Sequence, residues 1–415
     1  MRAAMASHPE IASAPRAGRM SFNEFVAFVA ATFALNALAI DVMIPALPHM
    51  AEALNIAQAN DRQAVIIVYL AGFSVAQLFF GPLSDRFGRR RVLLFGLALF
   101  CVAGFVSTIA QTYGQLLAAR LVQGLGGAAS RVIAMSLVRD RYSGREMGRV
   151  MSLAITVFMA VPILAPSVGQ LVLLVAPWRG VFGILVIASV AMFAWTWLRL
   201  DESLPLEQRQ SLAPGRIAGN YLQTMRHRIT AGYTLAIGVS MAALMGFVTS
   251  AQQIFVDVFG IDGRFTLLFA AIALSMSGAA FTNAQLVRRI GLRRLSHGAL
   301  ILFILIHSTH YLLASNGWQS LGLFMLMQAL GMFVYGFLGA NFNAIAMQAM
   351  GHIAGTAAAM IGFSSTALSA CVGYLIGGAF DLSVVPLAAG SALAGCAALM
   401  IILVAERGRL FSKHD

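Results

Sequence analysis

The chain contains few charged residues and few of the patterns that mark an enzyme. Only 11% of its 415 residues are Asp, Glu, Lys or Arg, whereas soluble proteins average about 25%. So little charge excludes a water-soluble fold of this size, because the polar surface would be too small. No phosphate-binding glycine loop and no nucleophile elbow is present, so we expect no enzyme and no cofactor. The three cysteines lack disulfide or metal-ligand spacing, so no metal site is expected either.

Long apolar segments are present instead, and 59% of the residues are hydrophobic. A helix of roughly 20 apolar residues spans the hydrocarbon core of a bilayer. In hydrocarbon the backbone must satisfy its own hydrogen bonds, so these segments should be helices. We therefore predict an all-α integral membrane protein with about twelve transmembrane helices, at residues 22–46, 63–82, 91–110, 114–137, 148–174, 178–198, 231–255, 265–286, 295–315, 318–341, 353–378 and 383–405.

The longest hydrophilic stretch divides the apolar segments into six and six. It begins at Asp201 and contains Pro205, Pro214 and Gly215. Two six-helix halves around a central cavity are the arrangement expected of a secondary transporter. The predicted organisation is a tail at 1–21, a six-helix bundle at 22–200, a linker at 201–230, a second bundle at 231–405 and a tail at 406–415.

The net charge of +12 could indicate nucleic-acid binding, but its distribution indicates membrane topology. In the twelve-span arrangement, 23 of the 28 Lys and Arg residues fall on one side and three on the other. This positive-inside pattern predicts that both termini are cytosolic, and it leaves no nucleic-acid partner to expect. Lys413 is the one lysine, against 27 arginines, which is typical of a GC-rich genome. We expect a bacterial inner membrane protein.

Three Asp or Arg residues lie well inside the predicted spans and not at their ends. Such groups are costly inside a membrane and mark functional sites. With a rise of about 1.5 Å per residue, Asp41 and Arg120 should both lie roughly 8–9 Å below the outer surface. Arg120 needs a partner, for which Asp41, backbone carbonyls and Gln123 are the candidates. Arg131 shares a helix face with Arg120, so it should line a water-filled cavity or extend to the cytosolic interface. Asp41 could alternatively cap a helix end ahead of Pro45.

A basic turn with a single acid separates the second and third segments. Membrane topology explains the bases of such a turn but not its acid or its glycines. A weaker copy at 284–295 keeps the second glycine and has Arg288 in place of the acid, which supports an internal repeat. The turn resembles, position for position, the loop between helices 2 and 3 of major facilitator superfamily transporters, and it reads Gly81-Pro-Leu-Ser-Asp85-Arg86-Phe-Gly88-Arg89-Arg90-Arg91-Val92.

Further motifs resemble those of proton-coupled drug antiporters in the same superfamily. The resemblance covers about residues 22–200 and is weaker beyond them. It extends to helix 4 (Arg120-Leu-Val-Gln123-Gly124), the loop after it (Val138-Arg139-Asp140-Arg141-Tyr142-Ser-Gly144) and the proline-glycine motif of helix 5 (Pro162-Ile-Leu-Ala165-Pro166-Ser-Val-Gly169). Asp41 with Pro45-Ala-Leu-Pro48, and Trp178-Arg179 with Phe182, are similar to the Bcr/CflA group of drug-resistance transporters.

The resemblance implies a major facilitator fold, a monomer, and export of a small drug-like molecule driven by inward proton flow. It assigns Asp41 as the proton acceptor and a substrate contact, with Arg120 stabilising the deprotonated acid or helping the proton to move. It places a conformational latch between the halves at Gly81, Asp85, Arg86, Gly88, Arg89 and Arg90. It also places a bend in helix 5 at Pro162, Pro166 and Gly169, where that helix would meet Gly373, Gly377 and Gly378.

The substrate cavity is expected to be lined by Asp41 and Arg131 together with Tyr69, Phe73, Phe158, Met159, Phe333 and Tyr335. Ordinary helix packing is the alternative explanation for each of these aromatic and methionine side chains. An exporter of a metabolite such as a sugar, amino acid or dipeptide is the alternative function. A non-transporting membrane sensor is a remote one, since the longest loop is too short for a signalling domain. The expected partners are a small-molecule substrate, protons and the lipid bilayer.

Overall fold

The computed structural model describes residues 20–209, 211–261 and 263–411, so nearly all of the predicted tail at 1–21 and Lys413 lie outside the described residues. Twelve helices within these ranges are long and apolar enough to cross a membrane, which confirms the predicted all-α membrane fold. They are α1 (Phe22–Asp41), α3 (Ala64–Phe87), α4 (Arg89–Ile109), α5 (Tyr113–Arg141), α6 (Gly144–Val175), α7 (Arg179–Arg199), α9 (Arg228–Gln253), α10 (Phe265–Ile290), α11 (Leu292–Ser315), α12 (Leu321–Met347), α13 (Ala354–Gly378) and α14 (Val385–Ala405).

Short helical segments complete the described chain. Some of them extend the long helices, so that three spans run over Phe22–Ala53, Asn60–Phe87 and Arg228–Val258. They are η1 (Ile44–Ala46), α2 (Leu47–Ala53), η2 (Ala59–Gln63), η3 (Leu206–Gln208), α8 (Pro214–Arg226), the π-helix η4 (Ile254–Val258) and η5 (Gly351–Ile353).

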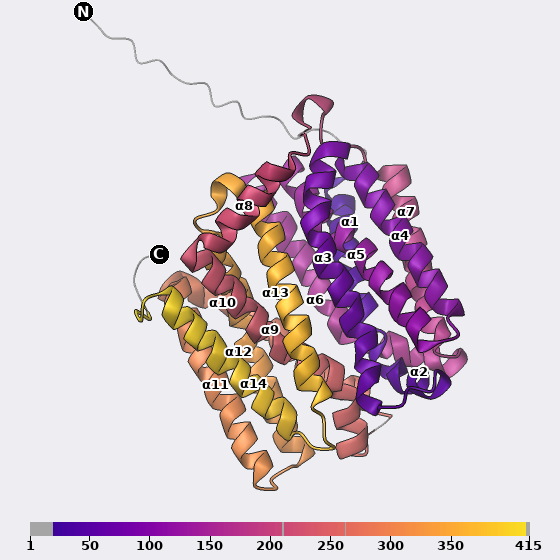
Figure 1. The fold of residues 1–415 in the computed structure, drawn as a ribbon, viewed down its shortest axis with the longest axis vertical. Coiled ribbons are helices and arrows are strands. Elements are labelled where there is room, and N and C mark those ends of the chain that lie inside the picture. The colour runs from indigo at the N-terminus through magenta and orange to yellow at the C-terminus, as the bar shows by residue number, and fades with distance from the viewer. Residues whose placement is uncertain (1–19, 210, 262, 412–415) are drawn as a thin grey trace, which may run out of the picture.

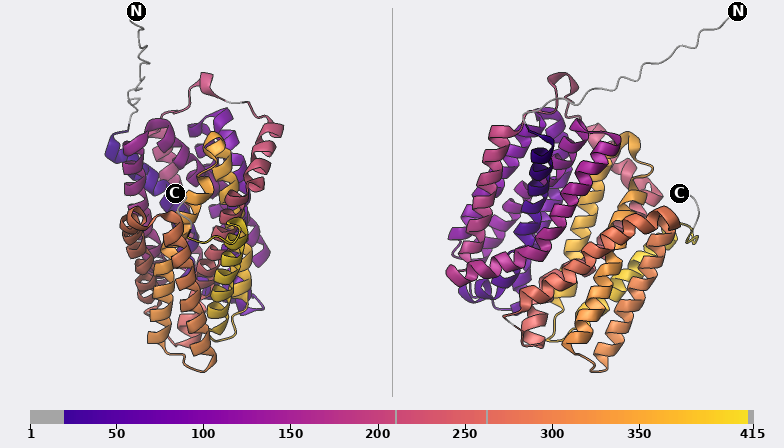
Figure 2. Two further views of the ribbon diagram at one scale, coloured as in Figure 1. Left: turned by 90° about the vertical axis from the view of Figure 1, so that its left-hand side faces the viewer. Right: turned by 180° about the vertical axis from the view of Figure 1, so that it is seen from behind.

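The first six and the last six long helices form two groups that lie side by side (Figures 1 and 2). The main contacts between long helices of the two groups are those of α3 with α13 and of α6 with α10. We call the end of the bundle that carries α8 and the turns at Gly88 and Gly291 the linker end. The opposite end, where α1 finishes at Asp41, is the far end.

The two basic turns have the same backbone conformation. Gly88 has φ 97° and ψ 150°, and Gly291 has φ 88° and ψ 154°. Only glycine adopts such positive φ values at low cost, so each turn can reverse the chain between two long helices without a loop. The weak sequence repeat therefore corresponds to a repeated backbone structure.

Helix α5 packs very closely on its neighbours, which the small residues of the first group allow. A Cβ atom at Gly124 would overlap the carbonyl oxygen of Tyr69 on α3. A Cβ atom at Gly126 would come within 2.5 Å of the backbone nitrogen of Phe100 on α4. A Cβ atom at Gly127 would overlap the Tyr69 hydroxyl and the Asn36 amide oxygen, so the small residues of α5 let polar side chains of α1 and α3 pack against it.

The polar contacts between the two groups gather at the far end. The Gln63 side chain donates to Gln253 (2.7 Å) and to the carbonyl of Gly377 (2.9 Å). Asn60 donates to the carbonyl of Gly378 (2.9 Å), and Arg62 lies 3.5 Å from Asp257. These contacts hold the two groups together at the far end in this arrangement.

Candidate functional site

Asp41 is the last residue of α1 and is buried, with 6% of its surface exposed. Within the described residues its carboxylate takes part in no ion pair and no side-chain hydrogen bond. The α-helix ends directly after it, and the 3₁₀ segment η1, which contains Pro45, follows from Ile44. The next residue, Val42, presses its carbonyl against Gly169 of α6. Asp41 is thus a buried acid at a point where α1 meets α6.

Arg120 is fully buried and makes three hydrogen bonds, none of them to Asp41. Its guanidinium donates to the carbonyls of Val65 (3.0 Å) and Ala39 (3.0 Å) and to Oε1 of Gln123 (2.6 Å). Of the candidate partners, the structure thus selects the carbonyls and Gln123. The expected pairing with Asp41 is absent here, because the donors point at the helix backbones of α1 and α3.

The ring of Tyr69 packs against the guanidinium of Arg120. The ring lies 4.4 Å from the guanidinium carbon, and the Tyr69 hydroxyl donates to Oδ1 of Asn36 (2.9 Å). Phe73 stacks on Tyr69 with the ring centroids 6.2 Å apart. Tyr69 and Phe73 are both buried, so neither presents a cavity wall in this arrangement. Asn36, whose Nδ2 has no partner among the described residues, was not anticipated from the sequence.

Arg131 lies in a different environment. It is exposed although it follows a run of buried residues on α5, and it lies near Tyr335 of α12. That helix belongs to the second group, so Arg131 lies on the side of α5 that faces the second group. Phe158 and Met159 are half-buried, and Phe158 contacts the ring of Phe33 on α1. Phe333 packs on Phe337 of its own helix, with ring centroids 5.4 Å apart.

Pro162 and Pro166 lie inside α6, which is continuous from Gly144 to Val175. Each proline lacks an N–H for the carbonyl four residues earlier, so the carbonyls of Phe158 and Pro162 lose their helical partners. Gly169 packs on Val42 and Pro45.

The prediction that the fifth long helix, α6, meets the eleventh, α13, is wrong. Gly373 packs on Met245 of α9, and Gly377 packs on Gln63 and Thr249. The main neighbours of α6 are α1 and α10 instead. Small residues indicate close packing, but they do not identify the partner helix.

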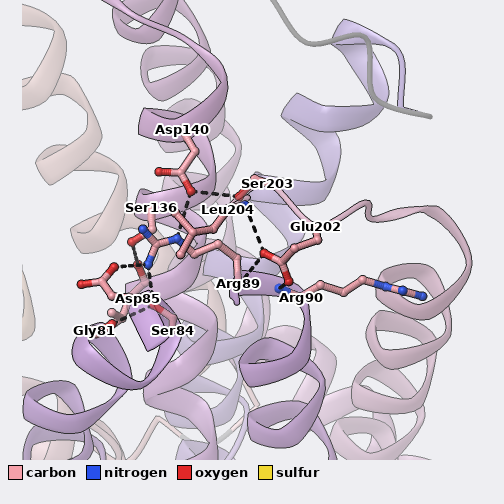
Figure 3. Close-up of polar contacts among 11 residues, drawn as sticks. Gly81, Ser84, Asp85, Arg89, Arg90, Ser136, Asp140, Glu202, Ser203 and Leu204 are labelled. Carbon is pink, nitrogen blue, oxygen red and sulfur yellow. Dashed lines mark hydrogen bonds and ion pairs between the residues drawn. The ribbon is translucent and has the colours of Figure 1, made fainter. Parts of the chain in front are cut away.

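The predicted latch residues form a charged network at the linker end (Figure 3). Arg89, which is buried, donates to Asp85 (2.5 Å), Ser84 (2.7 Å) and Asp140 (2.9 Å), and so joins the ends of α3 and α5 to the start of α4. Gly81 accepts a hydrogen bond from Ser84 through its carbonyl, and Arg86 is exposed.

The linker contributes an acid to this network that sequence reasoning missed. Glu202 accepts hydrogen bonds from the backbone N–H groups of Arg89 (2.7 Å) and Arg90 (3.2 Å), at the N-terminus of α4 (Figure 3). A carboxylate is favourable there because the first N–H groups of a helix have no helical acceptor. The hydrogen bonds of this network join the first six helices and the linker, so a latch between the two groups stays a prediction.

Comparison with known proteins identifies the family. The model of the Major Facilitator Superfamily matches residues 29–374. This chain belongs to the major facilitator superfamily. It is therefore a transporter and not an enzyme, and its twelve helices make it a multi-pass membrane protein.

Several relatives in the superfamily carry names. The chain is 28% identical to an uncharacterised transporter, YdgK, of Bacillus subtilis, over 83% of this chain and 86% of that protein. It is 27% identical to a bicyclomycin resistance protein homologue of Haemophilus influenzae, over 81% and 84%. It is 30% identical to the multidrug resistance protein MdtL of Escherichia coli, over 59% and 63%.

A solved structure confirms the superfamily fold. The xylose transporter XylE of E. coli, in a partially occluded inward-open conformation, aligns with a TM-score of 0.69 at 14% identity, over 91% of this chain and 96% of that one.

Proposed function

We propose that this transporter exports small, drug-like molecules in exchange for protons by alternating access, and that Asp41 carries the proton. One observation supports it most: within the described residues the buried carboxylate of Asp41 has no ion-pair or hydrogen-bond partner, and it lies in a segment long and apolar enough to span a membrane. Such a group is costly to keep and is a functional site by default. The names of the relatives, which concern bicyclomycin and multidrug resistance, support drugs as the substrate class.

The proposed transport cycle follows from the position of Asp41 toward the far end. The positive-inside pattern orients the far end outward and both termini toward the cytosol of a bacterium. The structure is closed at the far end through Gln63, Gln253 and Asn60. In this arrangement substrate enters from the linker end, and separation of the two groups at the far end releases it outside. A proton taken up by Asp41 from outside then travels back with the next rearrangement.

Arg120 has a positioning role in this proposal. It holds the carbonyl of Ala39, two residues before Asp41, and so fixes the end of α1 against α5. It makes no direct bond to the acid among the described residues. Arg131, Tyr335, Phe158 and Met159 are the proposed cavity contacts, because they lie between the groups or are partly exposed.

Proton release from the purified protein tests the proposal. Candidate drugs are added in detergent to the wild type, to Asp41→Asn and to Asp381→Asn, while substrate binding is measured separately. Asp381 is an exposed far-end acid and serves as the matched control. We expect release from the wild type and Asp381→Asn but not from Asp41→Asn. Equal release from all three would remove Asp41 from the mechanism, and binding without release in the wild type would refute proton exchange.

A further inference from the structure

The hydrophilic linker contains a helix that touches both groups. α8 packs against α13 and α9 of the second group, near the linker end (Figure 1). Thr224 is buried there, and Ser364 of α13 lies 3.9 Å from the sulfur of Met225. The hydroxyl of Tyr221 points the other way and donates to the carbonyl of Leu78 on α3, at 2.6 Å. α8 therefore crosses the seam between α3 and α13.

The acceptor of this bond is an unusual carbonyl. Leu78 lies four residues before Pro82, which is inside α3. Proline has no N–H, so the helical hydrogen bond that would satisfy the Leu78 carbonyl cannot form. The proline thus leaves an acceptor free in the middle of a helix, and the tyrosine of the linker occupies it. A buried carbonyl without a partner is costly, so both residues gain from the contact.

We propose that Tyr221 is a positioning residue for transport, which ties α8 to the carbonyl that Pro82 leaves free and so favours the arrangement closed at the far end. The inference rests on the proposed function in one respect, namely that the two groups move relative to each other. Because α8 is seated on the second group and Tyr221 bonds to the first, such movement must stretch or break this bond.

Two neighbouring features support the assignment. The seam is tight at this level, because Gln77 lies 3.5 Å from Thr366 and a Cβ atom on Gly362 would overlap the Gln77 amide. Burial raises the pKa of the Tyr221 phenol to about 12, and the carboxylate of Asp85 adds to the rise. The phenol therefore keeps its proton and remains a donor throughout the physiological pH range.

Spin-label distances between the two groups test the proposal. The three cysteines are replaced by serine, and labels are placed at Arg145→Cys and Arg289→Cys, exposed positions on α6 and α10 at the linker end. Distance distributions are then compared for the parent, Tyr221→Phe, Pro82→Ala and the double variant. Tyr311→Phe, an exposed tyrosine on α11, is the control.

We expect Tyr221→Phe to lower the population of this arrangement relative to others by roughly two- to tenfold, the range of one net hydrogen bond. Pro82→Ala restores the helical N–H, so the double variant should change little beyond Pro82→Ala alone. An unchanged distribution in Tyr221→Phe, or fully additive effects of the two substitutions, would overturn the proposal. The measurement needs neither substrate nor a proton gradient, so its failure is distinct from failure of proton release at Asp41.

Discussion

Replacing Arg120 by leucine should weaken the fold far more than replacing Asp41 by asparagine. The leucine removes three hydrogen bonds that the guanidinium donates. Their acceptors are the carbonyls of Ala39 and Val65 and the amide oxygen of Gln123. Each lost acceptor contact costs about 1–3 kcal/mol, and the loss is offset in part because a buried charge no longer has to be desolvated. We expect a net loss of about 2–4 kcal/mol in the free energy of unfolding.

The carbonyl of Ala39 makes this loss more than a local one. It lies in the last turn of α1, where carbonyls have no helical donor, and α1 has no basic residue there of its own. Arg120 supplies from α5 the cation that the negative end of α1 favours. A lysine at this position carries the charge but lacks the planar guanidinium group. The free energy of unfolding of Arg120→Lys should therefore lie between those of the wild type and Arg120→Leu.

Apparent melting temperatures in detergent, followed by tryptophan fluorescence at one scan rate, measure the difference. We expect Arg120→Leu to melt roughly 5–10 °C below the wild type. Asp41→Asn should stay within about 1 kcal/mol of it, because the carboxylate has no partner to lose among the described residues. If Asp41→Asn melted as low as Arg120→Leu, the two residues would form a pair in the resting protein and the reasoning would fail.

Two further predictions concern the ends of the bundle. Gln63→Ala and Gln253→Ala should each open the far end, and because the two side chains share one hydrogen bond, their effects on thiol labelling of a cysteine at the buried position Thr249 should be less than additive; additive effects would contradict a shared bond. Glu202→Ala should lower the melting temperature more than Glu202→Gln, since glutamine keeps an acceptor for the N-terminus of α4 and alanine does not, a difference of about 1 kcal/mol. Equal effects of the two substitutions would mean that the acid does not cap this helix.

Much of the fold was predictable because hydrocarbon imposes a simple rule on the sequence. Every span must be apolar, helical and about the same length, so twelve segments and their order follow from hydropathy. The glycines of the basic turns were also informative, since Gly88 and Gly291 both adopt positive φ. Helix neighbours were not predictable in this way. The partners of Gly169 and Gly373 depend on the rotation of each helix about its axis, which small residues alone do not determine.

The residues of the candidate site were easier to find than their partners. Burial cost identified Asp41 and Arg120, and depth counting correctly placed both toward the far end. The depth of a residue in the membrane does not specify where its side chain points, however. Every residue offers a backbone carbonyl, and these carbonyls compete with the single carboxylate of Asp41 for the donors of Arg120. Glu202 and Tyr221 were missed because the linker is not periodic and its polar residues look alike. The free carbonyl behind Pro82 was the one signal in the sequence that could have predicted a docking partner.

The separation of Asp41 from Arg120 bears on how one acid could serve a transport cycle. A residue that accepts and releases a proton must exchange partners as the protein moves, whereas a guanidinium held by three bonds from two helices is costly to move. In this chain the fixed charge and the proposed proton carrier are therefore different residues, joined through the backbone from Ala39 to Asp41. Any shift of α1 against α5 would change the distance of the acid from the fixed charge. The proposed coupling thus requires movement of a helix end, not the breaking of a salt bridge.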